Sequence, residues 1–369
     1  MNALFRSAKL GLLEACRFTG VNRAVHGSRW RSRRLLILCY HGISLEDEHG
    51  WRPQLFLPQD KFRQHLEILR GLGTNVLAFP EAMERLRTGD LPPRATAITF
   101  DDGFHNYAVA AAPILEEFGY PATLYLTTYY VDNQLPVPEV SAGYLLWKHR
   151  EKRAVLGRDL GFREDIELGS PEGRAKAVAA LARMMPNLNA ENKHSLLAAI
   201  ADRLDVDFDR WQAKRLFHLM NPAEIRQLCK DPAFDLQMHT HRHRTPREKA
   251  PFVREIRDNR DRIEALFGRS PVHFCYPSGD YDMRFLPWLR ECGVETATTC
   301  IAGLASPGHD PLLLPRALDW DEVTGSELRG WQSGTEFLLR RAYEHDRVSA
   351  ASTPSEGVAR SRVPEGTAV

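Results

Sequence analysis

The chain has 369 residues, of which 49 are Lys or Arg and 48 are Asp or Glu, and 43% are hydrophobic. This composition is typical of a globular protein, and the absence of a basic excess argues against a nucleic-acid partner. The length suits one large α/β barrel or two smaller domains.

Residues 1–34 form an N-terminal segment that is first amphipathic and then basic, with Arg29, Arg31, Arg33 and Arg34 close together. No apolar run reaches the roughly 18 residues of a membrane span, and the apolar core and cleavage site of a signal peptide are missing. The segment is either a helix that covers the barrel or a helix that lies on an anionic membrane face. We therefore expect a cytoplasmic protein, with peripheral contact to the inner membrane face as the sharper alternative.

Short apolar runs that end in polar residues alternate with segments of helical spacing. The runs predict strands at 35–41, 95–100, 121–127, 234–238, 272–276 and 296–300. The helical spacing predicts helices at 59–71, 80–88, 107–118, 251–267 and 284–291. Because strands and helices alternate, the sequence predicts an α/β fold with a parallel sheet or barrel.

This alternation is interrupted between about 131 and 217, where two helices are expected at 175–185 and 194–204. We interpret this stretch as a helical insertion in a barrel of residues 35–330. A C-terminal helix at 331–348 and a disordered tail at 349–369 are expected to follow. The six cysteines form no C-x-x-C pair, so we interpret them as reduced structural cysteines.

Two adjacent carboxylates, Asp101 and Asp102, follow a predicted buried strand and precede Gly103. Ligands bind at the carboxyl ends of parallel strands. A bound cation would relieve the repulsion of the two carboxylates by taking one as ligand and leaving the other ionised as a base. The alternative is a solvated Asp-Asp-Gly turn.

A second cluster, His239-Thr240-His241-Arg242-His243, follows another predicted strand. Imidazole and carboxylate are ligands for zinc and similar ions. His239 and His243 are four residues apart, as on one helical face, whereas His241 would point elsewhere. One Asp and two His would leave coordination positions open for water and substrate. The alternative is a polar loop that is rich in His by chance.

The two clusters together resemble the polysaccharide deacetylases, also called NodB-homology or carbohydrate esterase family 4 domains. Thr99 to Gly103 matches their T-F-D-D-G motif, and His239 to His243 matches H-[ST]-x-x-H. The resemblance implies a distorted (β/α) barrel of the glycoside hydrolase/deacetylase type. It also implies that Asp102, His239 and His243 bind one divalent metal ion. Zinc is the preferred candidate, and cobalt, nickel, iron and manganese are alternatives. Asp101 would be the general base.

The third family motif, F-R-P-P-Y-G, is altered to Phe-Cys-Tyr-Pro-Ser-Gly at 274–279. By this resemblance, Ser278, Tyr276 and Arg316 are the expected oxyanion and substrate residues. Ser278 can still stabilise an oxyanion through its backbone N–H. Cys275 stands where the family has the Arg that orients the base, and Arg316 is the candidate substitute. The fifth motif, which carries the acid His, is absent.

Residues Tyr40-His41-Gly42-Ile43 resemble the Y-H-x-[IV] strand end of the subgroup that includes poly-N-acetylglucosamine deacetylases. This resemblance makes His41 the candidate proton donor to the leaving amine, helped by a nearby carboxylate that keeps its imidazole protonated. The alternative is a core histidine at a strand end, in which case His105 or His273 would be the next candidate.

The resemblance therefore implies a metal-dependent hydrolase that removes N-acetyl groups from an N-acetylated glycan, in surface or exopolysaccharide assembly. Two alternatives stay open. The chain could deacylate a non-sugar amide or an O-acetyl ester, or it could be a glycan-binding barrel that has lost catalysis.

Overall fold

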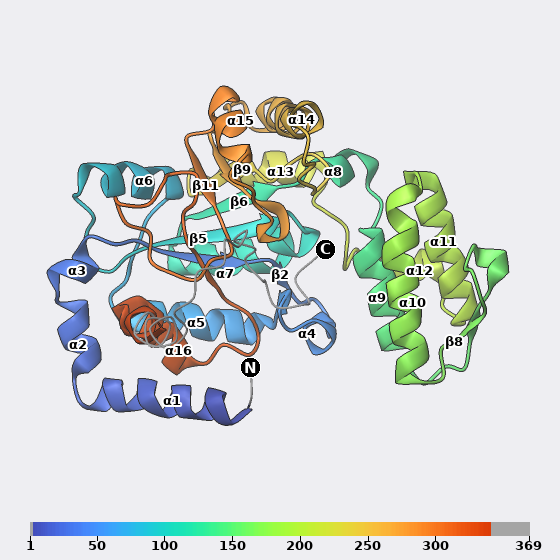
Figure 1. Cartoon of the computed structure of the whole chain (residues 1–369), viewed down its shortest axis with the longest axis horizontal. Helices are drawn as coiled ribbons and strands as arrows, with labels where there is room; N and C mark the ends of the chain where they lie inside the picture. The colour runs from blue at the N-terminus through green and yellow to red at the C-terminus, as the bar shows by residue number, and fades with distance from the viewer. Residues whose placement is uncertain (1–2, 341–369) are drawn as a thin grey trace, which may run out of the picture.

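A computed structural model describes residues 3–340 of the chain, and the expected tail at 349–369 lies outside them (Figure 1). A parallel sheet forms the centre, with strand order β11-β10-β9-β6-β5-β1-β12 and β4 paired to β5. The strands are β1 (Leu36–Tyr40), β4 (Asn75–Val76), β5 (Ala95–Asp102), β6 (Ala122–Leu126), β9 (Phe234–Met238), β10 (His273–Cys275), β11 (Thr296–Thr298) and β12 (Ala317–Leu318). The predicted α/β class and (β/α) barrel fold are confirmed.

The sheet curls toward closure through the segment that links its two outer strands. The Ala297 N–H donates to the Pro311 carbonyl and the Leu314 N–H donates to the Ala297 carbonyl, so this segment pairs with β11. The same segment continues into β12, which pairs with β1 at Leu38 and Cys39. All strand ends that carry chemistry therefore face one mouth of the barrel.

Helices cover the outside of the sheet in the βα order. They are α5 (Gln59–Gly71), α6 (Phe79–Thr88), α7 (Ala112–Phe118), α13 (Pro222–Leu228), α14 (Lys249–Phe267), α15 (Phe285–Glu291) and α16 (Gly325–Ser333). Helix α5 shows why they dock, since Phe62, Leu66 and Leu69 follow its inner face and are fully buried.

The helix expected at 107–118 is divided in the structure. Its first part, Tyr107–Ala111, is a π-helix, in which the Ala112 N–H donates to the Tyr107 carbonyl five residues earlier. Pro113 has no N–H to donate, so the regular bond to the preceding turn cannot form there. This local effect of Pro113 was not anticipated from the apolar spacing.

A group of elements between β6 and β9 stands beside the barrel (Figure 1, right). It contains α8 (Tyr129–Asn133), α9 (Pro138–Lys148), α10 (Pro171–Met184), α11 (Ala190–Arg203) and α12 (Phe208–Gln212), with the hairpin β7 (Val155–Leu156) and β8 (Ile166–Glu167). The Trp51 ring of α4 (Glu48–Trp51) contacts Tyr144 of α9, with ring centroids 5.8 Å apart. The expected boundaries of the insertion stay a prediction.

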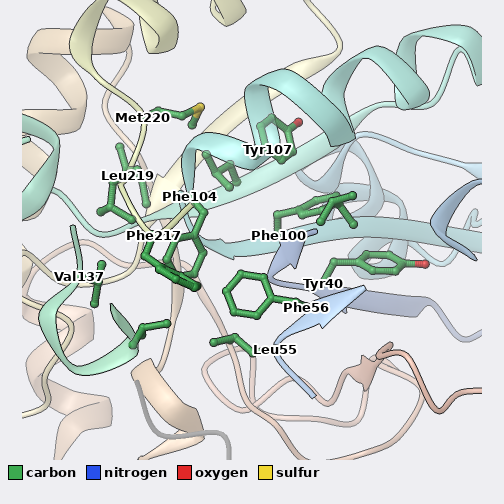
Figure 2. Close-up of a cluster of buried hydrophobic side chains, with 14 of the residues drawn as sticks. Tyr40, Leu55, Phe56, Phe100, Phe104, Tyr107, Val137, Phe217, Leu219 and Met220 are labelled. Carbon is green, nitrogen blue, oxygen red and sulfur yellow. The ribbon is translucent and has the colours of Figure 1, made fainter. Parts of the chain in front are cut away.

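Aromatic side chains join this group to the barrel (Figure 2). Phe56 of β3 (Phe56–Leu57) lies 5.7 Å, between ring centroids, from both Phe104 and Phe217. Tyr40 stacks on Phe100 at 5.2 Å. Such aromatic pairs contribute about 0.5–1.5 kcal/mol each beyond their buried area. The segment after β1, which carries the short strand β2 (Gly42–Ile43) paired with β3, is thus held firmly at the barrel mouth.

The N-terminal segment forms α1 (Ala3–Phe18), α2 (Val21–His26) and α3 (Arg29–Ser32). No helix in the described part of the chain is both long and apolar enough to cross a membrane. Within the basic run, Arg31 is buried and donates to the Gln332 carbonyl at 2.8 Å and to the Arg34 carbonyl at 2.6 Å. Arg31 therefore anchors the segment to the barrel and is not one of its surface charges.

Candidate metal centre and active site

The adjacent carboxylates close the central strand β5, which lies between β1 and β6. Asp102 has a positive φ of 73°, which turns the chain out of the sheet, and Gly103 follows with φ 95°. A Cβ on Gly103 would lie 2.2 Å from Leu126, so only glycine fits there. This turn presents Asp101 and Asp102 in different directions from adjacent positions.

Asp102, His239 and His243 lie around one point. The Nε2 atoms of His239 and His243 lie 3.3 and 3.2 Å from Asp102 Oδ1, and one ligand atom from each residue falls within 4.8 Å of the other two. His239 Nδ1–H donates to the Cys275 carbonyl at 2.9 Å, which leaves Nε2 directed at the shared point. The structure thus brings together the three side chains that the sequence motifs predict as metal ligands.

His241 points away from this group. Its Nδ1 lies 2.8 Å from Thr128 Oγ1, and its ring packs edge-on against Tyr129 at 5.7 Å between centroids. The change of direction comes from Thr240, whose φ is +61°. His243 also has a positive φ, of 53°, and such backbone conformations collect at functional sites because they aim side chains that regular structure could not.

A salt bridge with two hydrogen bonds holds Asp101. Arg316 Nη1 donates to Oδ1 at 2.8 Å, and Arg316 Nη2 donates to Oδ2 at 2.7 Å. Burial acts to raise the pKa of Asp101, but the Arg316 charge outweighs it and the pKa lies well below its usual range. Arg316 also donates to Thr99 Oγ1 at 3.3 Å, so the guanidinium spans the barrel interior. Asp101 therefore stays ionised and fixed in orientation.

His41 follows β1 and reaches the same mouth. Its Nε2 lies 3.9 Å from Asp101 Oδ2, and its side chain is 13% exposed. We expected the carboxylate to keep this imidazole protonated at neutral pH. Burial instead lowers the pKa of His41, and the opposing charges of Asp101 and Asp102 do not compensate. The resting imidazole is therefore neutral, which corrects that expectation.

The altered third motif forms a tight turn at the mouth. Ser278 has φ 54°, and among the described residues its N–H donates no hydrogen bond, so this donor is available. Tyr276 differs, because its N–H donates to the Thr298 carbonyl at 3.2 Å and its hydroxyl donates to the Leu312 carbonyl at 3.0 Å. Neither Tyr276 donor is free for a substrate, and Arg316 is equally occupied by Asp101.

The three-residue group fits a metal ion. Both Asp102 oxygens are buried and accept no hydrogen bond, which would cost free energy unless a cation neutralised them. Burial acts to raise the pKa of Asp102, but the neighbouring imidazoles of His239 and His243 outweigh it and keep this pKa well below its usual range. One carboxylate and two imidazoles form a donor set for zinc or a similar first-row ion.

The comparison with known proteins agrees with this geometry. The polysaccharide deacetylase family profile matches residues 88–166 and 173–297, more than half of the chain. The chain belongs to the polysaccharide deacetylase family. YxkH of Bacillus subtilis (strain 168), whose name assigns it to the same family, is 32% identical over 95 residues. That match spans 25% of this chain and 32% of YxkH.

Solved deacetylase structures share the fold of this family member. The Streptococcus pyogenes deacetylase PplD in complex with acetate superposes with a TM-score of 0.53 at 17% identity, covering 80% of this chain and 96% of PplD. IcaB from Ammonifex degensii gives a TM-score of 0.51 at 17% identity, covering 81% of this chain and 97% of IcaB. At these identities the likeness concerns the barrel fold alone.

Several residues that support the polysaccharide deacetylase site had no signal in the sequence. The Asn259 side chain in α14 accepts from the His239 N–H at 2.9 Å and donates to the Leu126 carbonyl at 2.9 Å. Cys39 Sγ lies 3.5 Å from Asp101 Oδ2. A lone Asn in a charged helix and a Cys in an apolar run match no motif, so only the fold reveals their positions.

Proposed function

We propose that this protein is a metal-dependent hydrolase that removes N-acetyl groups from an N-acetylated sugar of a glycan. The observation that carries the proposal is the juxtaposition of the Asp102, His239 and His243 group with an ionised Asp101 at one barrel mouth, in a chain of this family. Amide hydrolysis needs a base for the water and an acid for the departing nitrogen. The mouth offers candidates for both.

Asp102, His239 and His243 would hold the divalent ion, with zinc first among the candidates. When bound, the ion supplies positive charge that polarises the amide carbonyl and makes a water easier to deprotonate. Asp101 takes the proton from the attacking water, because Arg316 keeps its carboxylate ionised and fixed. The Ser278 N–H is the nearby donor that could stabilise the oxyanion of the tetrahedral intermediate.

His41 is proposed as the proton donor to the leaving amine. Because the resting imidazole is neutral, its proton has to arrive during the reaction. Asp101 lies 3.9 Å away and carries the proton taken from water. Imidazole is more basic than carboxylate, so transfer from Asp101 to His41 is downhill. At this distance the proton would pass through one bridging water, since direct transfer needs a shorter hydrogen bond.

The substrate is proposed to be a glycan that contains N-acetylglucosamine, since residues 40–43 resemble the poly-N-acetylglucosamine deacetylases. We place the activity in surface or exopolysaccharide assembly, at the cytoplasmic side of the membrane. A polymer, a lipid-linked intermediate and a nucleotide-linked intermediate all carry the required acetamide.

Acetate release tests the proposal. The purified protein is stripped with a chelator, reloaded with zinc, cobalt, nickel, iron or manganese, and incubated with β-1,4- and β-1,6-linked N-acetylglucosamine oligomers and with an O-acetylated sugar. We expect metal-dependent acetate release from an N-acetylated oligomer. Release from the O-acetyl ester alone would replace N-deacetylation by esterase activity. A loaded protein that binds oligomers but releases no acetate would support a binding barrel.

A further inference from the structure

Helix α1 uses only one face to pack on the barrel. Leu13 and Cys16 are buried on that face, and Lys9 forms salt bridges with Glu327 at 2.9 Å and Glu336 at 2.7 Å. These contacts dock α1 on α16 and fix its orientation. The opposite face is therefore held outward.

The outward face of α1 carries no charge. Residues at helical spacing along it are all exposed and uncharged, namely Ala8, Gly11, Leu12, Ala15 and Phe18. Leu12 is 48% exposed and Phe18 80% exposed, and Val21 at the start of α2 is 40% exposed. A helix on the surface of a water-soluble domain normally turns charged residues outward. Three large apolar side chains exposed between the middle of α1 and the start of α2 therefore need another explanation.

A cationic pocket lies beside these apolar residues. It has a volume of about 280 Å³, and its lining includes Arg17, Arg23, Arg94, Arg329 and His26 but no acidic residue. The neighbouring carboxylate is Glu14, which lies 3.4 Å from Arg17 Nη1. Arg94 donates to the Leu72 carbonyl and to His26.

Positive charge in this pocket is not balanced. Glu14 faces two of the arginines, since it pairs with Arg17 and also feels the charge of Arg329. Among the described residues, Arg23 forms no salt bridge. Burial, followed by the charges of Arg94 and Arg31, lowers the pKa of His26. A pocket of this charge is complementary to a phosphate group.

We propose that this docking corner, formed by Leu12, Phe18 and Val21 with the pocket arginines, binds an anionic phospholipid surface. The apolar side chains enter the headgroup region while the arginines contact lipid phosphates, and the two contributions add. A soluble phosphate would account for the pocket but not for the exposed Phe18 beside it. The inference does not depend on the proposed enzymatic activity.

Docking through this corner leaves the active site accessible. In Figure 1, α1 runs along the lower edge of the barrel below α16, and α2 rises at the left, whereas the insertion lies at the right. The loop after β5 joins the C-terminal end of the insertion, since the Met220 N–H donates to the Gly103 carbonyl, so the mouth with Asp101 and Asp102 lies on the insertion side. A membrane-docked protein could therefore still receive a long glycan from the aqueous phase.

Vesicle sedimentation of the full chain tests this inference. We expect binding to vesicles of phosphatidylcholine mixed with phosphatidylglycerol, weaker binding at high salt, and little binding to phosphatidylcholine alone. Arg23→Glu with Arg329→Glu should weaken binding at least about tenfold. Leu12→Ser with Phe18→Ser should also weaken vesicle binding, because it removes the apolar side chains that enter the headgroup region. Both side chains are exposed, so the variant should still fold.

Matched controls lie in the insertion. Val178→Ser is the control for the apolar variant, since Val178 is 46% exposed. Arg163→Glu is the control for the charge variant, since Arg163 is exposed and forms no salt bridge in the described structure. Both should bind vesicles like the wild type. Absence of vesicle binding by the wild type overturns the proposal, as does equal loss in the controls.

Two further results would assign the corner to another occupant and overturn the proposal. Stabilisation by inorganic phosphate that needs Arg23 and Arg329, without vesicle binding, would mean a soluble-anion site. A dimer in sedimentation velocity that Phe18→Ser dissociates would mean an interface between copies of this chain.

Discussion

Arg316 binds Asp101 through two hydrogen bonds, although the two residues lie 215 positions apart in the sequence. The family motif places its base-orienting arginine where this chain has Cys275. Here Cys275 Sγ lies 3.4 Å from Asp101 and accepts from Arg316 Nη2 at 3.0 Å. The arginine thus reaches the carboxylate from another segment, so the altered third motif does not leave Asp101 without a partner.

Removal of Arg316 should impair both folding and turnover. Arg316→Met leaves a buried carboxylate unpaired, which costs about 3–5 kcal/mol of stability. The double variant Arg316→Met, Asp101→Asn should recover much of that stability, because no buried charge remains, but not the activity. Urea unfolding and acetate release measure the two effects. Full activity of Arg316→Met would show that Asp101 does not need this partner.

The proposed acid and base should each be required for turnover but not for metal binding. Asp101→Asn and His41→Ala should lower kcat by about 10²–10⁴-fold while the metal content stays unchanged. His105 is the matched control, since its Nδ1 faces Glu224 Oε1 at 3.0 Å. If His105→Ala abolished turnover and His41→Ala did not, the acid would be misassigned.

The two neighbouring histidines should differ in metal binding. His239→Ala should lose the ion, because His239 Nε2 points at Asp102. His241→Ala should keep it and lose only the contact with Thr128, worth about 0.5–1.5 kcal/mol. Metal content after dialysis, measured by inductively coupled plasma mass spectrometry, compares the pair. Equal loss in both variants would mean that the ligand set is wrong.

His273 should make stability depend on pH. Burial lowers the pKa of His273 to about 4 from an ordinary value of 6.5, and the imidazole packs on Phe79 at 5.0 Å between ring centroids. The unfolded chain binds the proton more readily, so this contribution is present above about pH 6.5 and is lost as the pH falls toward 4.

Urea unfolding at about pH 7 and about pH 5 measures this effect against His273→Gln, which cannot take up the proton. The wild type should lose about 2 kcal/mol more than the variant between the two conditions. An equal loss of unfolding free energy in the wild type and the variant would mean that His273 takes up its proton in the folded state. His273 begins β10 and so lies at the opposite end of that strand from Cys275, which makes it a poor candidate for the catalytic acid.

Much of the barrel could be predicted because its strands are continuous apolar runs and its helices have one apolar face. Helix α9 could not, since nearly all its residues between Pro138 and Leu146 are buried and leave no periodic pattern. The change from π-helix to α-helix after Ala111 was also not predicted, because apolar spacing does not report that the Pro113 N–H is missing.

The residues of the site also fall into those that the sequence could predict and those that it could not. Asp101, Asp102, His239 and His243 belong to short motifs, so their proximity follows once the strands are parallel. The neutral state of His41 could not be predicted, because it depends on the balance between burial and the charges that surround the imidazole. The supporting side chain of Asn259 comes from a helix 20 residues after His239 and carries no motif.

The most direct test of the metal-centred account is anomalous diffraction from crystals of the zinc-loaded protein. The account predicts one strong peak about 2.0–2.2 Å from an Asp102 carboxylate oxygen and from Nε2 of both His239 and His243. A peak elsewhere, such as among Cys39, His41 and Asp101, or no peak from protein that releases acetate, would contradict it.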